Sequence, residues 1–271
     1  MDLNIDSEEL DLSNKQLLVV PDLTNFTNLK KLDLSNNRLT LLPLFNLPHL
    51  EILILANNIL FTLPPFNLPN LKKLSLANND FTIFPRLNLP NLERLSLFNN
   101  KLTNIPKLNL PNLKSLILSF NYLTDLSNLN LPNLEYLSLS CNRLNYLPEL
   151  NLPNLKKLKL FNNRLTKLPK LNLPNLELLH LSYNQLTTFS DTDLPNLKEL
   201  SLKKNPIINF NVQIPVNQDT IDDLVSIISD LPPLDFFDNN YLHKSIIEKL
   251  PEQYQEEYSK HNQRKIKRSF C

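Results

Sequence analysis

Leucine recurs along most of this chain in a pattern whose period is 21 residues. In the segment LKKLSLANNDF, which begins at Leu71, leucine holds the first, fourth and sixth places, asparagine the ninth and an apolar residue the eleventh. Nine leucines open this frame: Leu29, Leu50, Leu71, Leu92, Leu113, Leu134, Leu155, Leu176 and Leu197. A fixed period of this length predicts a solenoid, in which each repeat packs only against its neighbours.

The spacing of the leucines predicts a short strand in each repeat. The fourth and sixth places are two residues apart, so an extended backbone points both side chains to one face. Successive strands then stack in parallel about 4.8 Å apart, with the leucines inside the stack. The third, fifth, seventh, eighth and tenth places face outward, on a sheet that we expect to be concave.

Asparagine has two predicted structural roles. It holds the ninth place of every repeat: Asn37, Asn58, Asn79, Asn100, Asn121, Asn142, Asn163, Asn184 and Asn205. An amide both donates and accepts hydrogen bonds, so these side chains are expected to satisfy backbone groups where each strand turns away. The chain has no glycine, and turns that need positive φ must therefore use asparagine. The lack of glycine also excludes standard phosphate-binding loops, dinucleotide fingerprints and nucleophile elbows.

Proline recurs at the twentieth place and, except at Ser127 and Ser190, at the fifteenth place. Two prolines five residues apart disfavour a regular helix, so the convex side is predicted to be extended or briefly 3₁₀. A second asparagine series at the eighteenth place is expected to cap the turns there: Asn46, Asn67, Asn88, Asn109, Asn130, Asn151 and Asn172.

Charge alternates without a break at the second place: Glu8, Lys30, Glu51, Lys72, Glu93, Lys114, Glu135, Lys156, Glu177 and Lys198. In a parallel stack each of these residues lies beside the same place of the next repeat, so every neighbour carries the opposite charge. The pattern predicts a solvated ladder that helps to fix the register, each exposed pair contributing about 0.2–1 kcal/mol.

The two ends of the chain depart from the repeat. Residues 1–28 predict an N-terminal cap with a degenerate repeat, and residues 29–210 form the repeat domain, whose ninth repeat is incomplete. Residues 211–271 predict a helical segment with a basic tail. Within it, apolar residues at helical spacing over 220–231 predict a helix that covers the open end of the core.

Charge and cysteine usage narrow the classes of partner and compartment. Lys plus Arg is 28 and Asp plus Glu is 27, and this balance argues against a general affinity for nucleic acid or acidic membranes. Cys141 and Cys271 lie far apart, and the acidic N-terminal stretch has no signal-peptide pattern. We expect an intracellular, cytoplasmic monomer that needs no cofactor. The four histidines show no metal-ligand spacing.

Repeats such as LERLSLFNNKL and LKKLKLFNNRL resemble the intracellular leucine-rich-repeat family, over residues 29–210 and more loosely from about residue 7. The resemblance implies a leucine-rich-repeat solenoid, a curved horseshoe with a parallel sheet on its concave face, that serves as a protein-binding scaffold. The repeat length is closest to the short-repeat branch that contains phosphatase-1 regulatory subunits. That branch lacks this doubled proline, so a phosphatase partner is not implied.

The outward places of the middle repeats combine aromatic and basic side chains. The candidate partner-binding residues are Arg94, Phe98, Ile117, Phe120, Tyr122, Tyr136, Arg143, Lys159, Phe161, Arg164 and Tyr183. Solvent-facing aromatic rings beside arginine are typical of interface hot spots. We hypothesise a protein or peptide partner with an acidic, partly apolar surface. The alternative is that these rings merely pack against their neighbours along the sheet.

Two other functions are alternatives to that of a simple scaffold. In the first, the chain is an adaptor whose C-terminal helices recruit a second complex, as in a regulatory subunit or a ubiquitin ligase. In the second, it is an enzyme. His180 and Cys141 lie two repeats apart, roughly 10 Å at the spacing of parallel strands, which is too far for a nucleophile and its base. Catalysis is therefore not expected.

Overall fold

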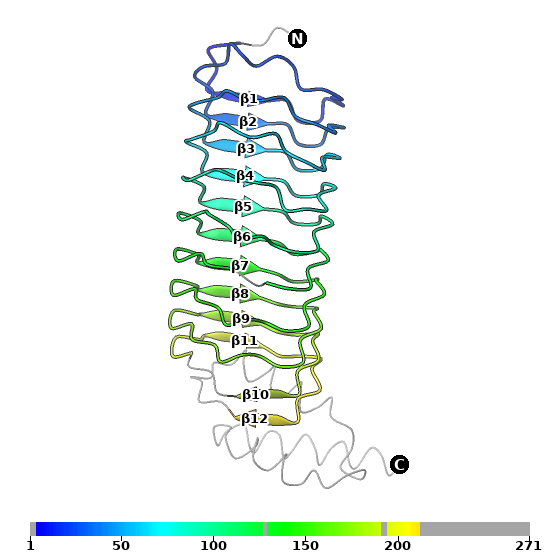
Figure 1. The fold of residues 1–271 in the computed structure, drawn as a ribbon, viewed down its shortest axis with the longest axis vertical. Coiled ribbons are helices and arrows are strands. Elements are labelled where there is room, and N and C mark those ends of the chain that lie inside the picture. Colours follow the sequence, from blue (N-terminus) through cyan, green and yellow to red (C-terminus); the bar gives the residue numbers. More distant parts are fainter. Residues whose placement is uncertain (1–3, 127–128, 191–193, 212–271) are drawn as a thin grey trace, which may run out of the picture.

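The computed structural model describes residues 4–126, 129–190 and 194–211. Figure 1 shows them as an elongated stack in which each turn of the chain lies on the one before it. The helices predicted within residues 211–271 lie outside the described part of the chain. In that described part, no helix has the length and apolar character needed to cross a lipid bilayer.

One parallel sheet of ten strands runs the length of the stack (Figure 1). Its strands, in order, are β1 (Glu9–Asp11), β2 (Lys31–Asp33), β3 (Ile52–Ile54), β4 (Lys73–Ser75), β5 (Arg94–Ser96), β6 (Ser115–Ile117), β7 (Tyr136–Ser138), β8 (Lys157–Lys159), β9 (Leu178–His180) and β11 (Glu199–Ser201). Each strand is only three residues long and carries the fourth place of its repeat at its centre. The predicted parallel solenoid is confirmed.

The register of the sheet follows the sequence period. From β2 onward each strand residue pairs with the residue 21 positions later, as Leu32 does with Leu53. The degenerate first repeat pairs with an offset of 22, which places Glu9 beside Lys31. The leucines of the first, fourth and sixth places are at most 2% exposed in all nine repeats. They form one continuous core, as the pattern predicted.

The ninth-place asparagines bind the backbone in the predicted manner. The amide nitrogen of Asn121 donates to the carbonyl of Leu118 in its own repeat (3.1 Å) and to that of Leu97 in the preceding repeat (2.9 Å). Its Oδ1 accepts the backbone N–H of Leu102 at 3.0 Å. The same contacts recur at Asn142. Each amide therefore joins two successive repeats at the turn that follows the strand.

The return side of each repeat is extended and contains no helix within the described residues. Its turns are capped at a place different from the one predicted. The eighteenth-place asparagines are exposed, whereas the twenty-first-place amides donate to the twentieth-place proline carbonyl of the preceding repeat. The amides that do so belong to Asn70, Asn91, Asn112, Asn133, Asn154, Asn175 and Asn196. The twenty-first place follows the proline directly, which puts its amide within reach of the neighbouring turn.

A second, two-stranded sheet shows why proline matters on this side. Strands β10 (Thr188–Ser190) and β12 (Asn209–Asn211) pair in parallel with the usual offset of 21 residues. Their fifteenth places hold Ser190 and Asn211 instead of proline. Proline has no N–H to donate to a strand ladder. In the described residues, the paired strands of the return side lie where that proline is absent, and an isolated parallel bridge also joins Asn46 to Asn67 in two repeats that keep it.

Candidate partner-binding surface

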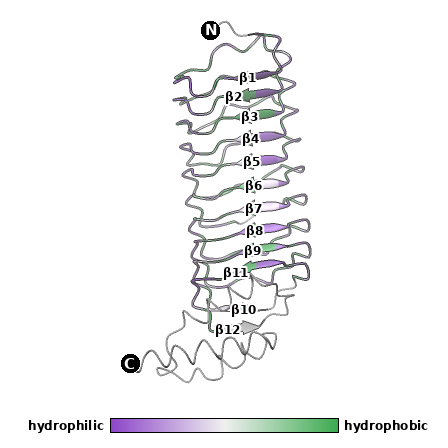
Figure 2. Ribbon diagram, turned by 180° about the vertical axis from the view of Figure 1, so that it is seen from behind, coloured by the Kyte–Doolittle hydropathy of each residue, from purple (hydrophilic) through white to green (hydrophobic). Residues whose placement is uncertain are grey.

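The predicted partner-binding residues all lie on one surface, which we call the sheet face. It comprises the third, fifth, seventh, eighth and tenth places of the repeats, on the side of the sheet that faces away from the core. All eleven residues are half-buried or exposed there. In Figure 2 the hydropathy of the strands changes from repeat to repeat, β3 and β9 being apolar and β4, β5 and β8 polar. The uniform core thus carries a variable outer surface.

Four of the aromatic residues form two matching pairs on the sheet face. The rings of Phe98 and Phe120 are tilted by 58°, with their centroids 5.1 Å apart. Those of Phe161 and Tyr183 are also 5.1 Å apart, with a tilt of 60°. Each pair joins the seventh place of one repeat to the eighth place of the next. Phe120 is 50% exposed and Tyr183 is 48% exposed, so both pairs present ring surface to solvent.

Two cations lie over the remaining tyrosines. The guanidinium carbon of Arg143 is 4.3 Å from the ring centre of Tyr122, and the ammonium of Lys159 is 5.8 Å from that of Tyr136. Both contacts join adjacent repeats and are in the range of a cation–π interaction. The aromatic and basic residues predicted as one site are therefore organised as four contacts between neighbouring repeats.

Three of the predicted residues stand apart from these contacts. Arg94 lies at the third place of β5 and Ile117 at the fifth place of β6, while Arg164 occupies a tenth place. Among the described residues, none of the three takes part in a ring contact or an ion pair. They lie on the same surface without being joined to its aromatic contacts.

The eighth place of every repeat adopts a left-handed backbone conformation. Asparagine stands there in five repeats, with φ between 50° and 57° at Asn36, Asn57, Asn78, Asn99 and Asn162. Phe120 and Tyr183 both have φ of 58°, and Cys141 and Lys204 have 55° and 60°. A residue with a bulky Cβ substituent is unfavourable in this region, whereas asparagine tolerates it. The two exposed aromatic pairs therefore include a strained residue each.

The backbone around these strained residues is held by hydrogen bonds. The N–H of Phe120 donates to the carbonyl of Ser140 at 2.9 Å, and that of Tyr183 donates to Lys203 at 2.7 Å. Phe120 also interrupts a row of side-chain amides, in which Asn99 donates to Asn78 at 2.9 Å and Asn78 to Asn57 in turn. An aromatic residue at this place adopts an unfavourable backbone conformation, and its side chain cannot take part in the row of amide hydrogen bonds.

The charge of the sheet face changes along the stack. Its N-terminal part is mixed, with the acids Glu9, Asp11, Asp33 and Asp80 and the bases Lys31, Arg38 and Lys73. From β5 onward it contains the bases Arg94, Lys101, Arg143, Lys157, Lys159, Arg164, Lys203 and Lys204. The acid in that second part is Glu199, whose carboxylate contacts the His180 ring at 2.5 Å. The region around the aromatic pairs is therefore strongly cationic, although the whole chain is nearly neutral.

The residues considered for catalysis have structural partners. His180 is engaged by Glu199, and the sulfur of Cys141 accepts a hydrogen bond from the Asn162 amide at 3.6 Å. Within residues 4–126, 129–190 and 194–211, the His, Cys, Asp and Glu side chains form no group of three that could hold a metal ion.

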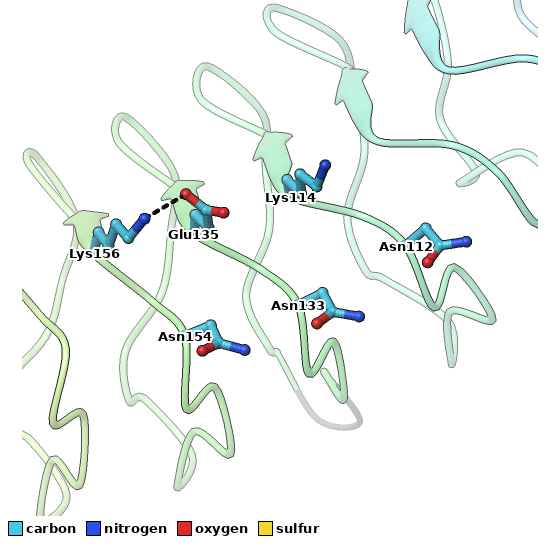
Figure 3. A pocket seen from close by; sticks show the side chains of 6 residues that line it. All are labelled: Asn112, Lys114, Asn133, Glu135, Asn154 and Lys156. Atoms are coloured by element: carbon cyan, nitrogen blue, oxygen red, sulfur yellow. Dashed lines mark hydrogen bonds and ion pairs between the residues drawn. The ribbon is translucent and has the colours of Figure 1, made fainter.

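The second-place charges form a ladder along one edge of the sheet, and it resolves into pairs. Each lysine bonds the glutamate of the preceding repeat, in the pairs Glu8–Lys30, Glu51–Lys72, Glu93–Lys114, Glu135–Lys156 and Glu177–Lys198. Figure 3 shows the central part of the ladder, where Lys114, Glu135 and Lys156 line a shallow hollow above a row of capping asparagines. The side chains that line the hollow already form ion pairs or hydrogen bonds, so we assign the hollow a structural role.

Glu135→Gln is expected to reduce stability at neutral pH, and this effect should become smaller as the pH falls. The hydrogen bond from Lys156 holds the pKa of Glu135 below its ordinary value. A lowered carboxyl pKa contributes stability above the unfolded-state pKa of about 4.3 and loses it as the pH falls through the folded-state pKa. Thermal unfolding of both proteins at pH 7 and pH 3 tests this prediction. A gap in melting temperature that is as large at pH 3 as at pH 7 contradicts it, and Glu149→Gln, an exposed acid outside the ladder, is the control.

The replacement of asparagine by aromatic residues at the eighth place is visible in the sequence, but the need for positive φ at this place was not predicted. The signal was present, because the chain has no glycine and asparagine recurs at that place in five repeats. Lys203 and Lys204 extend the basic region and were also missed, since the aromatic residues end one repeat earlier.

Comparison with known families agrees with this architecture. A profile described as "Leucine Rich Repeat" matches residues 28–48, and one described as "Leucine Rich repeats (2 copies)" matches residues 69–191 in overlapping pairs. Together these matches cover more than half of the chain. The protein belongs to the leucine-rich-repeat family, whose fold serves as a protein–protein interaction module.

Several solved structures share the fold. YopM, a leucine-rich effector protein from Yersinia pestis, is 30% identical with a TM-score of 0.58, over 78% of this chain and 71% of that chain. The leucine-rich repeat domain of APL1B is 25% identical with a TM-score of 0.61, over 80% of this chain and 74% of that one. TLR13, solved in complex with ssRNA13, is 26% identical with a TM-score of 0.57, over 81% of this chain and 42% of that one. No curated protein matches the chain.

Proposed function

We propose that this protein is a scaffold that binds a partner protein on its sheet face, between Arg94 and Tyr183. The observation that carries the proposal is the pair of strained aromatic residues, Phe120 and Tyr183. Asparagine is used at the same place in five other repeats and suits the backbone better. Residues kept in an unfavourable conformation are concentrated at functional sites, where a gain in function offsets the cost.

The surroundings of these two residues support binding. Each ring is about half exposed and packs against the phenylalanine of the preceding repeat, so the apolar surface is rigid before a partner arrives. Arginine and lysine lie nearby over tyrosine rings. Pre-organised aromatic residues lose little conformational entropy on binding, and aromatic and arginine side chains dominate interface hot spots. An acidic, partly apolar partner surface fits this combination.

Replacing Phe120 and Tyr183 by asparagine is expected to abolish binding with little change in stability. Each substitution relieves an unfavourable left-handed residue, worth roughly 1 kcal/mol, and removes an aromatic pair worth about 0.5–1.5 kcal/mol, so the two effects on the free energy of unfolding nearly offset one another. Urea denaturation measures the stability. Quantitative affinity capture from an extract with the immobilised full chain, wild type beside the double variant, measures the binding.

A matched control and a second variant complete the experiment. Tyr146→Asn removes an exposed tyrosine that lies outside the sheet face and should leave the captured proteins unchanged. Charge reversal at Lys159 and Arg164 combined with Tyr136→Ala tests the basic component and should also remove them. Undiminished capture by the folded double variant would place the binding surface elsewhere.

A further inference from the structure

We propose that the sheet face recognises an extended acidic segment with two bulky apolar side chains four residues apart. This inference rests on the proposed function and specifies the partner. The two aromatic pairs are the anchoring points. Both pairs have the same geometry, with centroid distances of 5.1 Å and tilts of 58° and 60°. The second pair lies three repeats after the first, as the positions of Phe98 and Phe161 show.

The separation of the pairs sets the spacing of the anchors. Three steps of a parallel stack are about 14 Å at 4.8 Å per strand. An extended peptide advances about 3.3 Å per residue, so four residues span about 13 Å. In an extended chain, side chains two and four residues apart point to the same face. A peptide lying along the stack can thus place one apolar side chain on each aromatic pair.

Between the pairs, the row of seventh and eighth places carries no large apolar side chain. Ser119, Ser140, Cys141 and Asn162 hold these places, and the Ser119 hydroxyl is bonded to that of Ser138 at 2.6 Å. This gap leaves room for the central side chain of the peptide. It also argues against single-stranded nucleic acid along this row, because successive bases stack on successive aromatic side chains, whereas the rings of the intervening repeats, Tyr122 and Tyr136, lie outside the row at the tenth and third places.

The charges around the gap select an acidic residue at the centre. Arg143, Lys157, Lys159 and Arg164 border it, and none of the sheet-face places of these repeats holds an acid. The guanidinium of Arg143 lies over the ring of Tyr122, which leaves its N–H edge free for a carboxylate. The expected motif is an apolar residue, any residue, an acid, any residue and a second apolar residue.

Synthetic peptides test the motif directly. A fluorescein-labelled peptide Glu-Asp-Phe-Ser-Glu-Ser-Phe-Asp-Glu is titrated with the full-length protein, and binding is followed by fluorescence anisotropy. Moving the second phenylalanine one residue closer, or replacing all acids by lysine, should weaken binding about tenfold or more. The variant with Phe120→Asn and Tyr183→Asn should show a similar loss, whereas Tyr146→Asn should bind as the wild type does.

The outcomes separate this inference from the proposed function. Equal affinity for both spacings, or no binding of the peptide, overturns the inference. If capture of a cellular protein still depends on Phe120 and Tyr183, the proposed function stands without it. A labelled single-stranded oligouridylate is titrated in parallel. Tighter binding of that RNA, lost in the Phe120→Asn and Tyr183→Asn variant, overturns the peptide class in favour of nucleic acid.

Discussion

Asn142→Ala is expected to lower the free energy of unfolding by about 2–4 kcal/mol, because a buried amide that joins two repeats is lost. The Asn142 side chain is 8% exposed. It donates to the carbonyl of Leu118 at 3.0 Å and to that of Leu139 at 2.9 Å, and it accepts the N–H of Leu123 at 3.0 Å. Alanine leaves that N–H without its partner in a buried turn, which costs more than the hydrogen bond itself contributes.

The two carbonyls are affected less than the N–H, because each also accepts a neighbouring asparagine. Leu118 receives Asn121 at 3.1 Å, and Leu139 receives Asn163 at 3.0 Å. The loss therefore falls mainly on the junction between two repeats. Urea denaturation followed by circular dichroism measures it, and Asn145→Ala, an exposed asparagine of the same repeat, is the control. A change below about 1 kcal/mol would mean that water replaces the amide.

Aspartate at position 142 separates hydrogen bonding from packing, since it has nearly the shape of asparagine. An ionised carboxylate only accepts hydrogen bonds, so it would face the carbonyls of Leu118 and Leu139 without a proton to donate. Asn142→Asp should therefore be more destabilising than Asn142→Ala at pH 7. Protonation restores one donor, so the difference between the two variants should narrow near pH 4. An Asp variant as stable as wild type at pH 7 contradicts the assigned role.

Leu118→Ala is expected to destabilise the protein by about 2–5 kcal/mol, in the range of buried leucine truncations. Leu118 holds the sixth place at the middle of the stack and is fully buried. The repeats before and after it are held by their own leucines and amides, so the surrounding structure has little freedom to collapse into the cavity. We therefore expect the loss in free energy of unfolding to lie in the upper half of that range.

Ile117→Ala provides the matched comparison for this core variant. Ile117 directly precedes Leu118 but lies at the fifth place on the sheet face, where it is half-buried. Its truncation should cost about 1 kcal/mol or less, because little apolar area leaves the core. Chemical denaturation of both variants tests the difference. Similar losses at the two positions would show that the leucine frame does not separate core from surface.

The core and the strands could be predicted from the sequence because a single period describes both. Leucine holds the places of Leu71, Leu74 and Leu76 in every repeat, and the burial of these side chains follows directly from the alternation of faces along the strand. The return side was harder to predict. Buried leucines such as Leu152 and Leu173 contribute to the core there, but proline-rich extended backbone has no simple period from which their direction can be read.

The candidate site was predicted as a set of residues and not as a set of contacts. The pairing of Phe98 with Phe120 depends on the turn after the strand, which brings a seventh place against the eighth place of the next repeat. Counting residues along one repeat does not reveal that neighbour. Arg143 and Arg164 differ for a simpler reason, because both hold tenth places. The tenth place before Arg143 is Tyr122, whereas the tenth place before Arg164 is Arg143 itself.

Near-identical repeats create a specific danger during folding, because a strand can dock on the wrong copy. If one repeat were looped out, as when β6 pairs with β8 instead of β7, the leucines and asparagines would still match. The ladder at the sheet edge would not, since Lys114 would then lie beside Lys156. Like charges placed directly opposite one another are destabilising. The alternation of Glu and Lys thus destabilises a misfolded stack in which a single repeat is skipped. Such skipping is the simplest mispairing for a chain with a repeat of 21 residues.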